Sequence, residues 1–451
     1  MQILQAGLSY FLAVFLAGFL LGTARVLWLA PAVGPRAAEL AELPLMLAFA
    51  IAAAVWLVRR FSLEPAPGAR LGMGVLALAL LLAAEFSLVL PARGMTAVQY
   101  LANLDLVAAA AHYAALVVMA VAPLFVQPSV ARRGRLAFAS TVALLAAVAA
   151  VIALKYRYDL DDAHAHVATG SELVQTPCGP IEYAVVGEGP ALLLVHGAGG
   201  GFDQTAGFAQ EFAARGFRVI TMSRFGYLRT PRPALASPAA QADAHACLLD
   251  ALKISRAAIV GASAGAPSSM QFALRHAKRC SALVLLVPLA YAPQAAERLA
   301  PPPAAARWMF ESAIKSDFLY WLAAEVSPPL VIGSILATPP YLVERADAAE
   351  KARIAWMLRQ PLPVSARQEG LLNDVGIAVT LERYELEHIA APTLVISARD
   401  DFYGTYASSL YTAQHIAGAR FLGLEDGGHL WVGHHREVMN EIVSFLSTSA
   451  R

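Results

Sequence analysis

AAIVGASAGAPSSM, residues 257–270, is a short apolar run that breaks at Gly-Ala-Ser-Ala-Gly and resumes with residues compatible with a helix. The run predicts a buried strand. The small residues Gly261 and Gly265 let the chain turn sharply around Ser263 without a side-chain clash. Such a turn lifts a serine hydroxyl above the strand end and points the N-terminus of the following helix at it. Ser263 is therefore the first candidate nucleophile.

Six further apolar runs accompany this strand, and most are separated by segments long enough to form helices. They are residues 181–187, 191–197, 217–223, 281–288, 392–398 and 419–425. Near-continuous runs of Val, Ile and Leu with helical crossovers predict an α/β fold, with a doubly wound, mostly parallel sheet covered on both faces. Ligands of such sheets bind beyond the carboxyl ends of the strands. The residues directly after each run are therefore expected to form a site.

The ends of the last two runs carry the groups that a serine nucleophile needs. A serine hydroxyl is activated by a base that takes its proton and by a carboxylate that orients the base. The next-to-last run is followed by Asp400 and Asp401, and the last run is followed by two glycines and His429. We assign Asp401 as the acid because it lies further into the turn, and Asp400 as a residue that caps the turn. The chain order Ser263, Asp401, His429 fits a nucleophile on a strand–turn–helix.

Two other histidines, His434 and His435, follow closely but fall in the next predicted helix, and we expect them on the surface. A metal site built on these histidines lacks an acidic partner at a workable spacing. The segment DDAHAH, residues 161–166, is expected to be solvated, because nothing in the sequence fixes its geometry. We predict neither a metal nor an organic cofactor.

A glycine-rich turn, VHGAGGGFDQ at 195–204, offers backbone amides to a developing negative charge. The expected oxyanion donors are the amides of Ala264, directly after the serine, and Ala198, with Gly199 as the alternative second donor. A phosphate-binding loop is the competing interpretation. The turn has neither the Lys-Ser/Thr ending of a P-loop nor the glycine spacing of a dinucleotide-binding loop, so an oxyanion-binding loop is favoured.

Together these motifs resemble those of α/β-hydrolase-fold proteins, a family that includes esterases, C–C bond hydrolases and proline iminopeptidases. The resemblance extends over about residues 171–449 and rests on HGAGG, GASAG, RDD and GGH in the family's order. It implies that Ser263, Asp401 and His429 form a catalytic triad.

Two segments beside the expected site resemble the family less closely. SRFGYLRTPRP, 223–233, is similar to the arginine–glycine turn after the fourth strand, but Leu228 and Thr230 replace the usual glycine and serine. An insertion at about 290–388 is expected to form a helical cap. Its aromatic residues either line an acyl or aromatic pocket, form the cap's own core, or place a helix against the bilayer. They are Trp308, Phe310, Phe318, Tyr320, Trp321 and Trp356.

The N-terminal part of the chain has the composition of a membrane protein. The chain is 58% hydrophobic and 15% charged, against about 45–50% and about 25% in soluble domains. Five apolar stretches have the length of about 17–25 residues needed to cross a bilayer. They are residues 7–30, 40–58, 71–90, 106–126 and 136–154. We predict a transmembrane helical region at 1–157, a linker at 158–170 and an α/β-hydrolase domain at 171–449.

Basic residues predict the orientation of this region. The second and fourth connections carry six of them, and the first and third connections together with the end of the fifth span carry four. The six are Arg59, Arg60, Arg70, Arg132, Arg133 and Arg135, and the four are Arg36, Arg93, Lys155 and Arg157. The positive-inside bias places the N-terminus in the cytoplasm. Five crossings then place the hydrolase domain outside, on the periplasmic face of a bacterial inner membrane or in the extracellular space.

Four ionisable residues lie within or beside the expected spans. They are Arg25, Glu42, Glu85 and His112. Charge inside a membrane is costly and is usually paired. We expect these side chains to hold the helices together by hydrogen bonds between them.

The sequence thus predicts a membrane-anchored serine hydrolase that cleaves an ester or related acyl bond of a small or lipid-like substrate. Two alternatives stay open: an acyltransferase with the same triad, and a catalytically idle sensor domain coupled to the membrane region. The net charge of +1 gives no reason to expect nucleic acid as a partner. Cys178, Cys247 and Cys280 allow one disulfide, and the sequence selects no pair.

Overall fold

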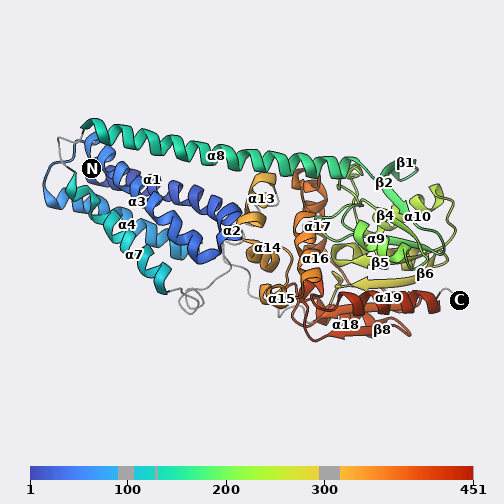
Figure 1. Cartoon of the computed structure of the whole chain (residues 1–451). Helices are drawn as coiled ribbons and strands as arrows, with labels where there is room; N and C mark the ends of the chain where they lie inside the picture. The colour runs from blue at the N-terminus through green and yellow to red at the C-terminus, as the bar shows by residue number, and fades with distance from the viewer. Residues whose placement is uncertain (90–105, 127–130, 294–314, 450–451) are drawn as a thin grey trace. The chain divides into compact units, whose positions relative to one another are not determined.

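The computed structural model describes residues 1–89, 106–126, 131–293 and 315–449 (Figure 1). The chain divides into two compact units, each with a core of its own. The first unit comprises Met1–Asp159 and Glu325–Ser327, and the second comprises Leu160–Ala324 and Pro328–Arg451. The first unit is built of helices, and the second is built on a β-sheet.

The helices of the first unit are long and apolar. They are α1 (Gln2–Ala24), α3 (Pro35–Arg60), α4 (Pro67–Ala84), α7 (Leu106–Val121) and the first part of α8 (Ala131–Ala168). Four segments among the described residues are long and apolar enough to cross a membrane, and they match the first four predicted spans: Gln2–Val33, Pro35–Arg60, Pro67–Ser87 and Val107–Phe125. The fifth predicted span, 136–154, is helical within α8, and its side chains at 136–138 and 141 lie outside the described residues.

The four ionisable side chains predicted within or beside the spans lie in two pairs. Arg25 in the π-helical turn after α1 forms an ion pair with Glu42 of α3 at 2.6 Å. His112 of α7 lies 3.9 Å from the Glu85 carboxylate, in the turn after α4. Each pair joins helices that are separate in the sequence, which agrees with the expected role in holding the bundle together.

Helix α8 continues where a linker was expected. Residues 158–168, most of the predicted linker at 158–170, belong to this helix. The segment is rich in alanine, and Lys155 pairs with Asp159 one turn later, so both intrinsic propensity and an i,i+4 ion pair favour the helix. Gly170, with φ of +79°, follows the helix end in the left-handed conformation common after helices.

The second unit is built on one eight-stranded sheet with the strand order β1-β2-β4-β3-β5-β6-β7-β8. The strands are β1 (Glu172–Thr176), β2 (Gly179–Val186), β3 (Ala191–Val195), β4 (Arg218–Met222), β5 (Ala257–Ala262), β6 (Cys280–Leu286), β7 (Thr393–Ala398) and β8 (Arg420–Leu424). Strand β2 runs antiparallel to both β1 and β4, and all other pairs are parallel. The seven predicted runs are β2 to β8. Strand β1 escaped prediction because it is mostly exposed and only partly apolar.

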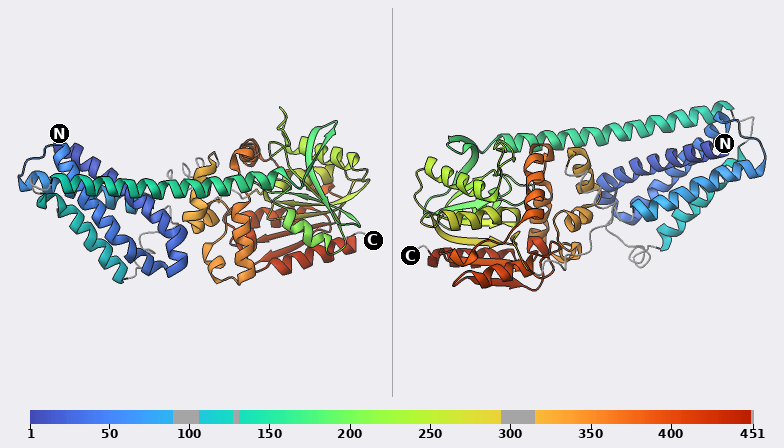
Figure 2. Two further views of the ribbon diagram at one scale, coloured as in Figure 1. Left: turned by 45° about the horizontal axis from the view of Figure 1, so that its top comes forward. Right: turned by 180° about the vertical axis from the view of Figure 1, so that it is seen from behind.

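Both faces of this sheet are buried, as the apolar strands require. Alternate residues of β3 point to opposite faces: Leu193 and Val195 join one core, and Leu192 and Leu194 join the other. The first core also contains residues of α10 (Pro238–Ala251), α11 (Ala266–Arg275) and α18 (Thr405–His415), and the second contains residues of α9 (Ala206–Ala213) and α19 (His435–Ser449) (Figure 2).

The described part of the predicted cap is helical. It contains α13 (Asp317–Val326), α14 (Pro328–Ser334), α15 (Pro340–Arg345), α16 (Ala348–Arg359) and α17 (Gln368–Thr380). Trp308 and Phe310 lie outside the described residues. Tyr320 and Trp321 are both 1% exposed, whereas Phe318 is 39% exposed. The aromatic residues therefore mainly build the core of the cap, and Tyr320 also lines a cavity.

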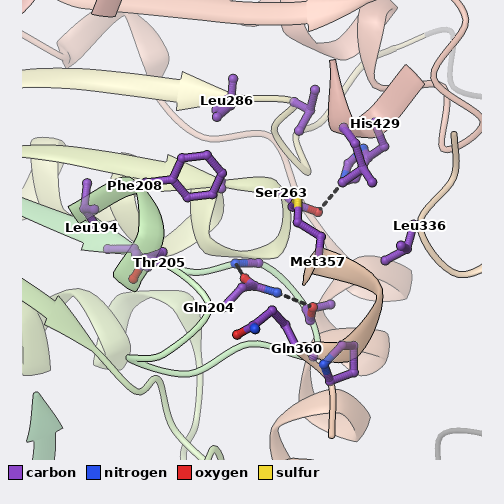
Figure 3. A pocket seen from close by; sticks show the side chains of 18 of the residues that line it. Leu194, Gln204, Thr205, Phe208, Ser263, Leu286, Leu336, Met357, Gln360 and His429 are labelled. Carbon is purple, nitrogen blue, oxygen red and sulfur yellow. Dashed lines mark hydrogen bonds between the residues drawn. The ribbon is translucent and has the colours of Figure 1, made fainter. Parts of the chain in front are cut away.

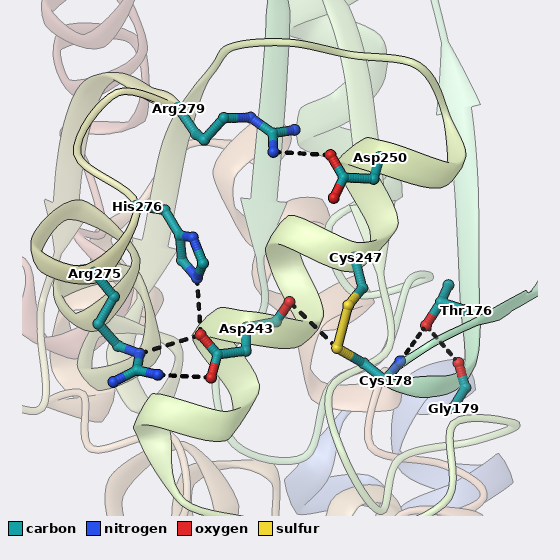
Figure 4. Close-up of a disulfide and its surroundings, with 9 residues drawn as sticks. All are labelled: Thr176, Cys178, Gly179, Asp243, Cys247, Asp250, Arg275, His276 and Arg279. Atoms are coloured by element: carbon teal, nitrogen blue, oxygen red, sulfur yellow. Dashed lines mark hydrogen bonds and ion pairs between the residues drawn. A yellow bond between two sulfur atoms is a disulfide. The ribbon is translucent and has the colours of Figure 1, made fainter.

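One disulfide joins the start of the sheet to the helix beside it. Cys178, in the turn between β1 and β2, is bonded to Cys247 of α10, with their Cα atoms 6.2 Å apart (Figure 4). Nearby, Asp243 of α10 accepts hydrogen bonds from Arg275, the last residue of α11, and from His276 directly after it. Cys280 is buried and free. The disulfide links segments that are far apart in the sequence, so no local pattern revealed it.

Candidate active site

Ser263 occupies a tight turn that only this spacing of glycines permits. It follows β5 directly and has φ of +48°, in the left-handed region that side chains rarely adopt. A side chain at Gly261 would overlap Ser269, and a Cβ at Gly265 would lie 2.6 Å from the carbonyl oxygen of Val195. The two glycines are therefore required by close packing, which holds the serine at the end of its strand.

The three predicted triad residues lie together, and Figure 3 shows the Ser263 hydroxyl beside His429. The Ser263 hydroxyl lies 2.9 Å from His429 Nε2, and His429 Nδ1 lies 2.7 Å from the Asp401 carboxylate. Asp401 follows β7 and His429 follows β8, so neighbouring strand ends supply both side chains. Asp401 is 4% exposed and His429 is 8% exposed. The arrangement provides a proton path from the hydroxyl to the imidazole and an acceptor that orients the imidazole.

Asp401 is held by more donors than the histidine alone. Its second oxygen accepts from the backbone N–H of Tyr403 at 2.8 Å, and the Thr405 hydroxyl donates to the oxygen that faces the histidine. Asp400, expected to cap its own turn, instead accepts from the N–H of Gly428 at 2.7 Å. It thereby ties the acid-bearing turn to the turn that carries the histidine.

The three predicted oxyanion donors differ in their availability. Gly199 donates its amide hydrogen to the Tyr227 hydroxyl at 3.3 Å, so it is already engaged. Within the part of the chain that the structure describes, the amides of Ala198 and Ala264 donate no hydrogen bond. Ala264 directly follows the serine, and Ala198 lines the same cavity as the serine. This pair is therefore better placed than Gly199 to bind an oxyanion.

A buried ionic network, missed by the sequence analysis, fixes the glycine-rich loop. Arg224 forms two parallel hydrogen bonds of 2.7 Å to Asp374 of α17 and donates to the carbonyl oxygen of His196 at 2.9 Å. The Tyr227 hydroxyl donates to the same Asp374 carboxylate. Asp374 escaped notice because nothing in the cap sequence distinguishes it from a surface acid.

His196 of the HGAGG motif supports the same loop as a neutral group. Its Nδ1–H donates to the carbonyl oxygen of Gly197 at 2.7 Å, and its Nε2 accepts from the N–H of Arg224 at 2.9 Å. Complete burial, together with the charge of Arg224, holds the pKa of His196 well below its usual value. The imidazole is therefore uncharged at neutral pH and positions the loop.

A second buried pair links the cap to this loop. Arg367, at the start of α17, binds Asp203 at 2.7 and 3.0 Å and donates to the carbonyl oxygen of Gly200 at 2.6 Å. Its side chain is fully buried. Paired charges thus hold both ends of the glycine-rich loop. Arg224 comes from the turn after β4, and Arg367 comes from the cap.

Leu228 and Thr230, which depart from the pattern expected after the fourth strand, are both held by hydrogen bonds. Leu228, where the family has glycine, has φ of +51°, a conformation that glycine favours. Its N–H donates to the carbonyl oxygen of Ala366 at 2.9 Å. The Thr230 hydroxyl accepts from the N–H of Glu182 at 2.9 Å. Hydrogen bonds to the cap and to the sheet therefore stabilise this turn, although Leu228 and Thr230 replace the glycine and serine expected there.

The cap also holds the histidine-bearing turn. The carbonyl oxygen of Ala337, between α14 and α15, accepts from the N–H of Phe402 at 3.0 Å and from that of His429 at 3.3 Å. One cap residue thus bridges the acid turn and the histidine turn. The Thr338 hydroxyl accepts from the N–H of Leu430 at 3.1 Å.

An ion pair on α16 completes this support. Arg353 binds Glu350 at 2.6 and 2.8 Å and donates to the carbonyl oxygen of Leu430 at 2.7 Å. Glu350 in turn accepts from the N–H of Gly433 at 3.0 Å. Arg353 and Glu350 therefore bind the histidine-bearing turn on both sides of Trp431, which has the left-handed backbone conformation.

A cavity of about 160 Å³ opens at Ser263 and His429. Its wall is mostly apolar and comes from the sheet, from α9, from α19 and from the cap. Representative residues are Leu194, Phe208, Leu286 and Met357, which Figure 3 shows, together with Leu371 and Ile442. Two carboxamides, Gln204 and Gln360, also line it. The cavity suits an apolar chain attached to a reacting carbonyl.

The other two histidines near the site bind carboxylates instead, and both are half-buried, whereas a surface position was expected. His434 binds Asp426 and Glu437 at 2.8 and 2.9 Å, and His435 binds Glu211 at 2.9 Å. Among the described residues, no group of three or more His, Cys, Asp or Glu side chains is arranged to hold a metal ion.

Comparison with known proteins identifies the family. The family model for the alpha/beta hydrolase fold matches residues 190–432. The chain is 27% identical over 285 residues to the uncharacterized hydrolase YcgS of Bacillus subtilis, covering 60% of this chain and 96% of that protein. It is 26% identical over 280 residues to a 2-hydroxy-6-oxononadienedioate/2-hydroxy-6-oxononatrienedioate hydrolase of Paraburkholderia xenovorans, covering 59% and 90%.

A solved structure is similar over the same region. The alpha/beta hydrolase fold protein from Nakamurella multipartita is 28% identical, with a TM-score of 0.44, and the match covers 61% of this chain and 98% of that one. The named sequence relatives are hydrolases, which supports hydrolase activity for this chain. Because the family model matches more than half of its length, the chain belongs to the α/β-hydrolase-fold family.

Proposed function

We propose that the protein is a membrane-anchored serine hydrolase that cleaves an ester or related acyl bond through a covalent acyl-enzyme. The observation that carries the proposal is the hydrogen-bonded series Ser263–His429–Asp401, with distances of 2.9 and 2.7 Å, at the end of an apolar cavity. The nucleophile, base and orienting acid occupy the relative positions that acyl transfer needs.

The first half of the reaction forms the acyl-enzyme. The Ser263 oxygen attacks the substrate carbonyl carbon while its proton passes to His429 Nε2. The negative oxygen of the tetrahedral intermediate accepts hydrogen bonds from the amides of Ala198 and Ala264. The intermediate collapses when the bond to the leaving group breaks, and His429 gives its proton to the departing alcohol oxygen.

The second half regenerates the enzyme. Water enters the site, loses a proton to His429 and attacks the acyl carbon. The second tetrahedral intermediate breaks the bond to Ser263, and His429 returns the proton to the serine oxygen. Asp401 remains ionised throughout and stabilises the imidazolium that forms in each half.

A fluorophosphonate probe tests this proposal directly, because it labels only an activated serine. We expect the intact protein to be labelled and Ser263→Ala to abolish labelling. Ser334→Ala, which removes an exposed serine of α14, serves as the control and should leave labelling unchanged. Absence of labelling in folded protein would favour a catalytically idle sensor domain.

The proposal extends to the membrane. We place the N-terminus in the cytoplasm and count five crossings, the fifth within α8, so that the hydrolase domain lies outside. The disulfide between Cys178 and Cys247 supports this placement, since disulfides persist in oxidising compartments and are rare in the cytosol.

A topology reporter tests this placement. Alkaline phosphatase fused after Arg157 is expected to be active in bacterial cells, because that enzyme folds only outside the cytoplasm. Activity of a reporter that works only in the cytoplasm, fused at the same position, would overturn the proposed placement of the hydrolase domain. In the same cells, a thiol reagent should modify Cys178 only after reduction.

A further inference from the structure

Gln360 lines the cavity that contains Ser263 and carries an unused hydrogen-bond acceptor. It follows α16, is 7% exposed and lines the cavity wall (Figure 3). Its Oε1 has no donor within hydrogen-bonding distance among the residues that the structure describes. Buried polar atoms are nearly always paired, because an unpaired one loses its bonds to water without replacement. The carboxamide therefore calls for a partner that enters the cavity.

The main chain on both sides of Gln360 is anchored. The buried Tyr320 hydroxyl donates to the carbonyl oxygen of Leu358 at 2.8 Å. Arg367 donates to the carbonyl oxygen of Leu362 at 3.2 Å. The segment that carries Gln360 is thus tied to α13 and to the fully buried arginine of the cap. A side chain on such a segment is preorganised for recognition.

The other carboxamide of the cavity serves as an internal comparison. Gln204 accepts from the N–H of Gly197 at 3.1 Å, and its Nε2 lies 3.5 Å from the carbonyl oxygen of Ala198. Its acceptor is thus occupied by the loop that offers the oxyanion donors. No donor among the described residues lies within hydrogen-bonding distance of Gln360 Oε1, although both glutamines line the same mostly apolar wall.

We infer that Gln360 is a specificity-determining residue and that the substrate is an acyl ester whose apolar chain carries a hydroxyl or amide N–H. This inference rests on the proposed function. The apolar wall receives the chain, and the substrate's O–H or N–H donates to Gln360 Oε1. An unsubstituted chain leaves that oxygen buried and unpaired, and sites of this kind discriminate strongly against analogues that lack the donor.

The test uses the full-length protein in detergent and para-nitrophenyl octanoate as the reference substrate. Matched probes are derivatives of this ester with one hydroxyl at successive carbons of the chain, and para-nitrophenyl acetamidohexanoate. We expect at least one donor-bearing ester to exceed the reference in kcat/KM by about tenfold or more. Gln360→Met, of similar length without a strong acceptor, should abolish this preference.

Met357→Leu is the matched control, because it changes an apolar neighbour on the same wall and should keep the preference. The inference is overturned if no donor-bearing ester is preferred, or if the preference survives Gln360→Met. Fluorophosphonate labelling of Ser263 in each preparation separates the two proposals and reports folding of the variants. Labelling without a donor preference refutes the recognition role alone, and absence of labelling in wild-type protein refutes both.

Discussion

The turn that carries Ser263 and the turn that carries His429 are supported in different ways. The serine turn is held by close packing inside the sheet, where Gly261 and Gly265 leave no room for a side chain. The histidine turn is held from outside, by the Ala337 carbonyl and the Arg353–Glu350 pair of the cap. The serine therefore depends on its own sequence neighbours, and the histidine depends on a separate insertion.

This difference explains why the sequence predicts the serine turn well and the histidine turn only in part. A short glycine pattern encodes the steric demand at the serine. The residues that support the histidine lie about eighty to ninety positions away and resemble ordinary surface residues of amphipathic helices. The cap therefore takes part in positioning the base as well as in enclosing the cavity.

The largest expected effect tests which histidine is the base. His429→Ala should lower kcat by about a thousandfold or more, because the serine loses its proton acceptor. His434→Ala, on the neighbouring surface, should change kcat by less than about twofold. Ester hydrolysis measured on both purified variants checks the prediction, and equal losses would contradict the assignment.

A smaller effect tests whether the cap positions the histidine turn. Arg353→Ala should lower kcat by about ten- to a hundredfold with little change in KM, because the base loses alignment while the cavity wall stays. Lys351→Ala, an exposed change on the same helix, is the control and should behave as wild type. A loss confined to KM would assign Arg353 to substrate binding instead.

The smallest effect concerns the pH dependence of stability, which should differ between the two turns. Behind the serine turn, His245 contacts the Ser268 hydroxyl at 3.1 Å, and burial lowers the pKa of this histidine to about 3. The unfolded chain binds this proton near pH 6.5, so folding stability is full above that pH and is lost as the pH falls toward 3. The slope reaches about 1.4 kcal/mol per pH unit for one histidine.

At the histidine turn, burial acts to raise the pKa of Glu350, but the bonds from Arg353 outweigh it and lower the pKa overall. The contribution of Glu350 to folding stability is therefore retained until the pH falls below the ordinary carboxyl range. Denaturant unfolding at pH 7.5, 6 and 5, followed by tryptophan fluorescence, measures the acid loss, and His245→Gln should reduce its slope. An unchanged slope in this variant would assign the loss to other groups.

Much of the site could be anticipated because it lies at strand ends. The apolar runs indicated seven of the eight strands, and the residues after three of them proved to be Ser263, Asp401 and His429, within hydrogen-bonding distance of one another. Asp374, Arg367 and Gln360 were missed because their burial arises only when the cap packs on the loops. The helical continuation of α8 was missed because alanine and alternating charges suit a solvated linker equally well.

The two buried arginine–aspartate pairs between the cap and the rest of the fold restrict how product leaves. Arg224 binds Asp374 and Arg367 binds Asp203, each through two charge-assisted hydrogen bonds that detachment of the cap would break. Under the proposed function, the alcohol and acid products would leave through an opening that keeps both pairs intact.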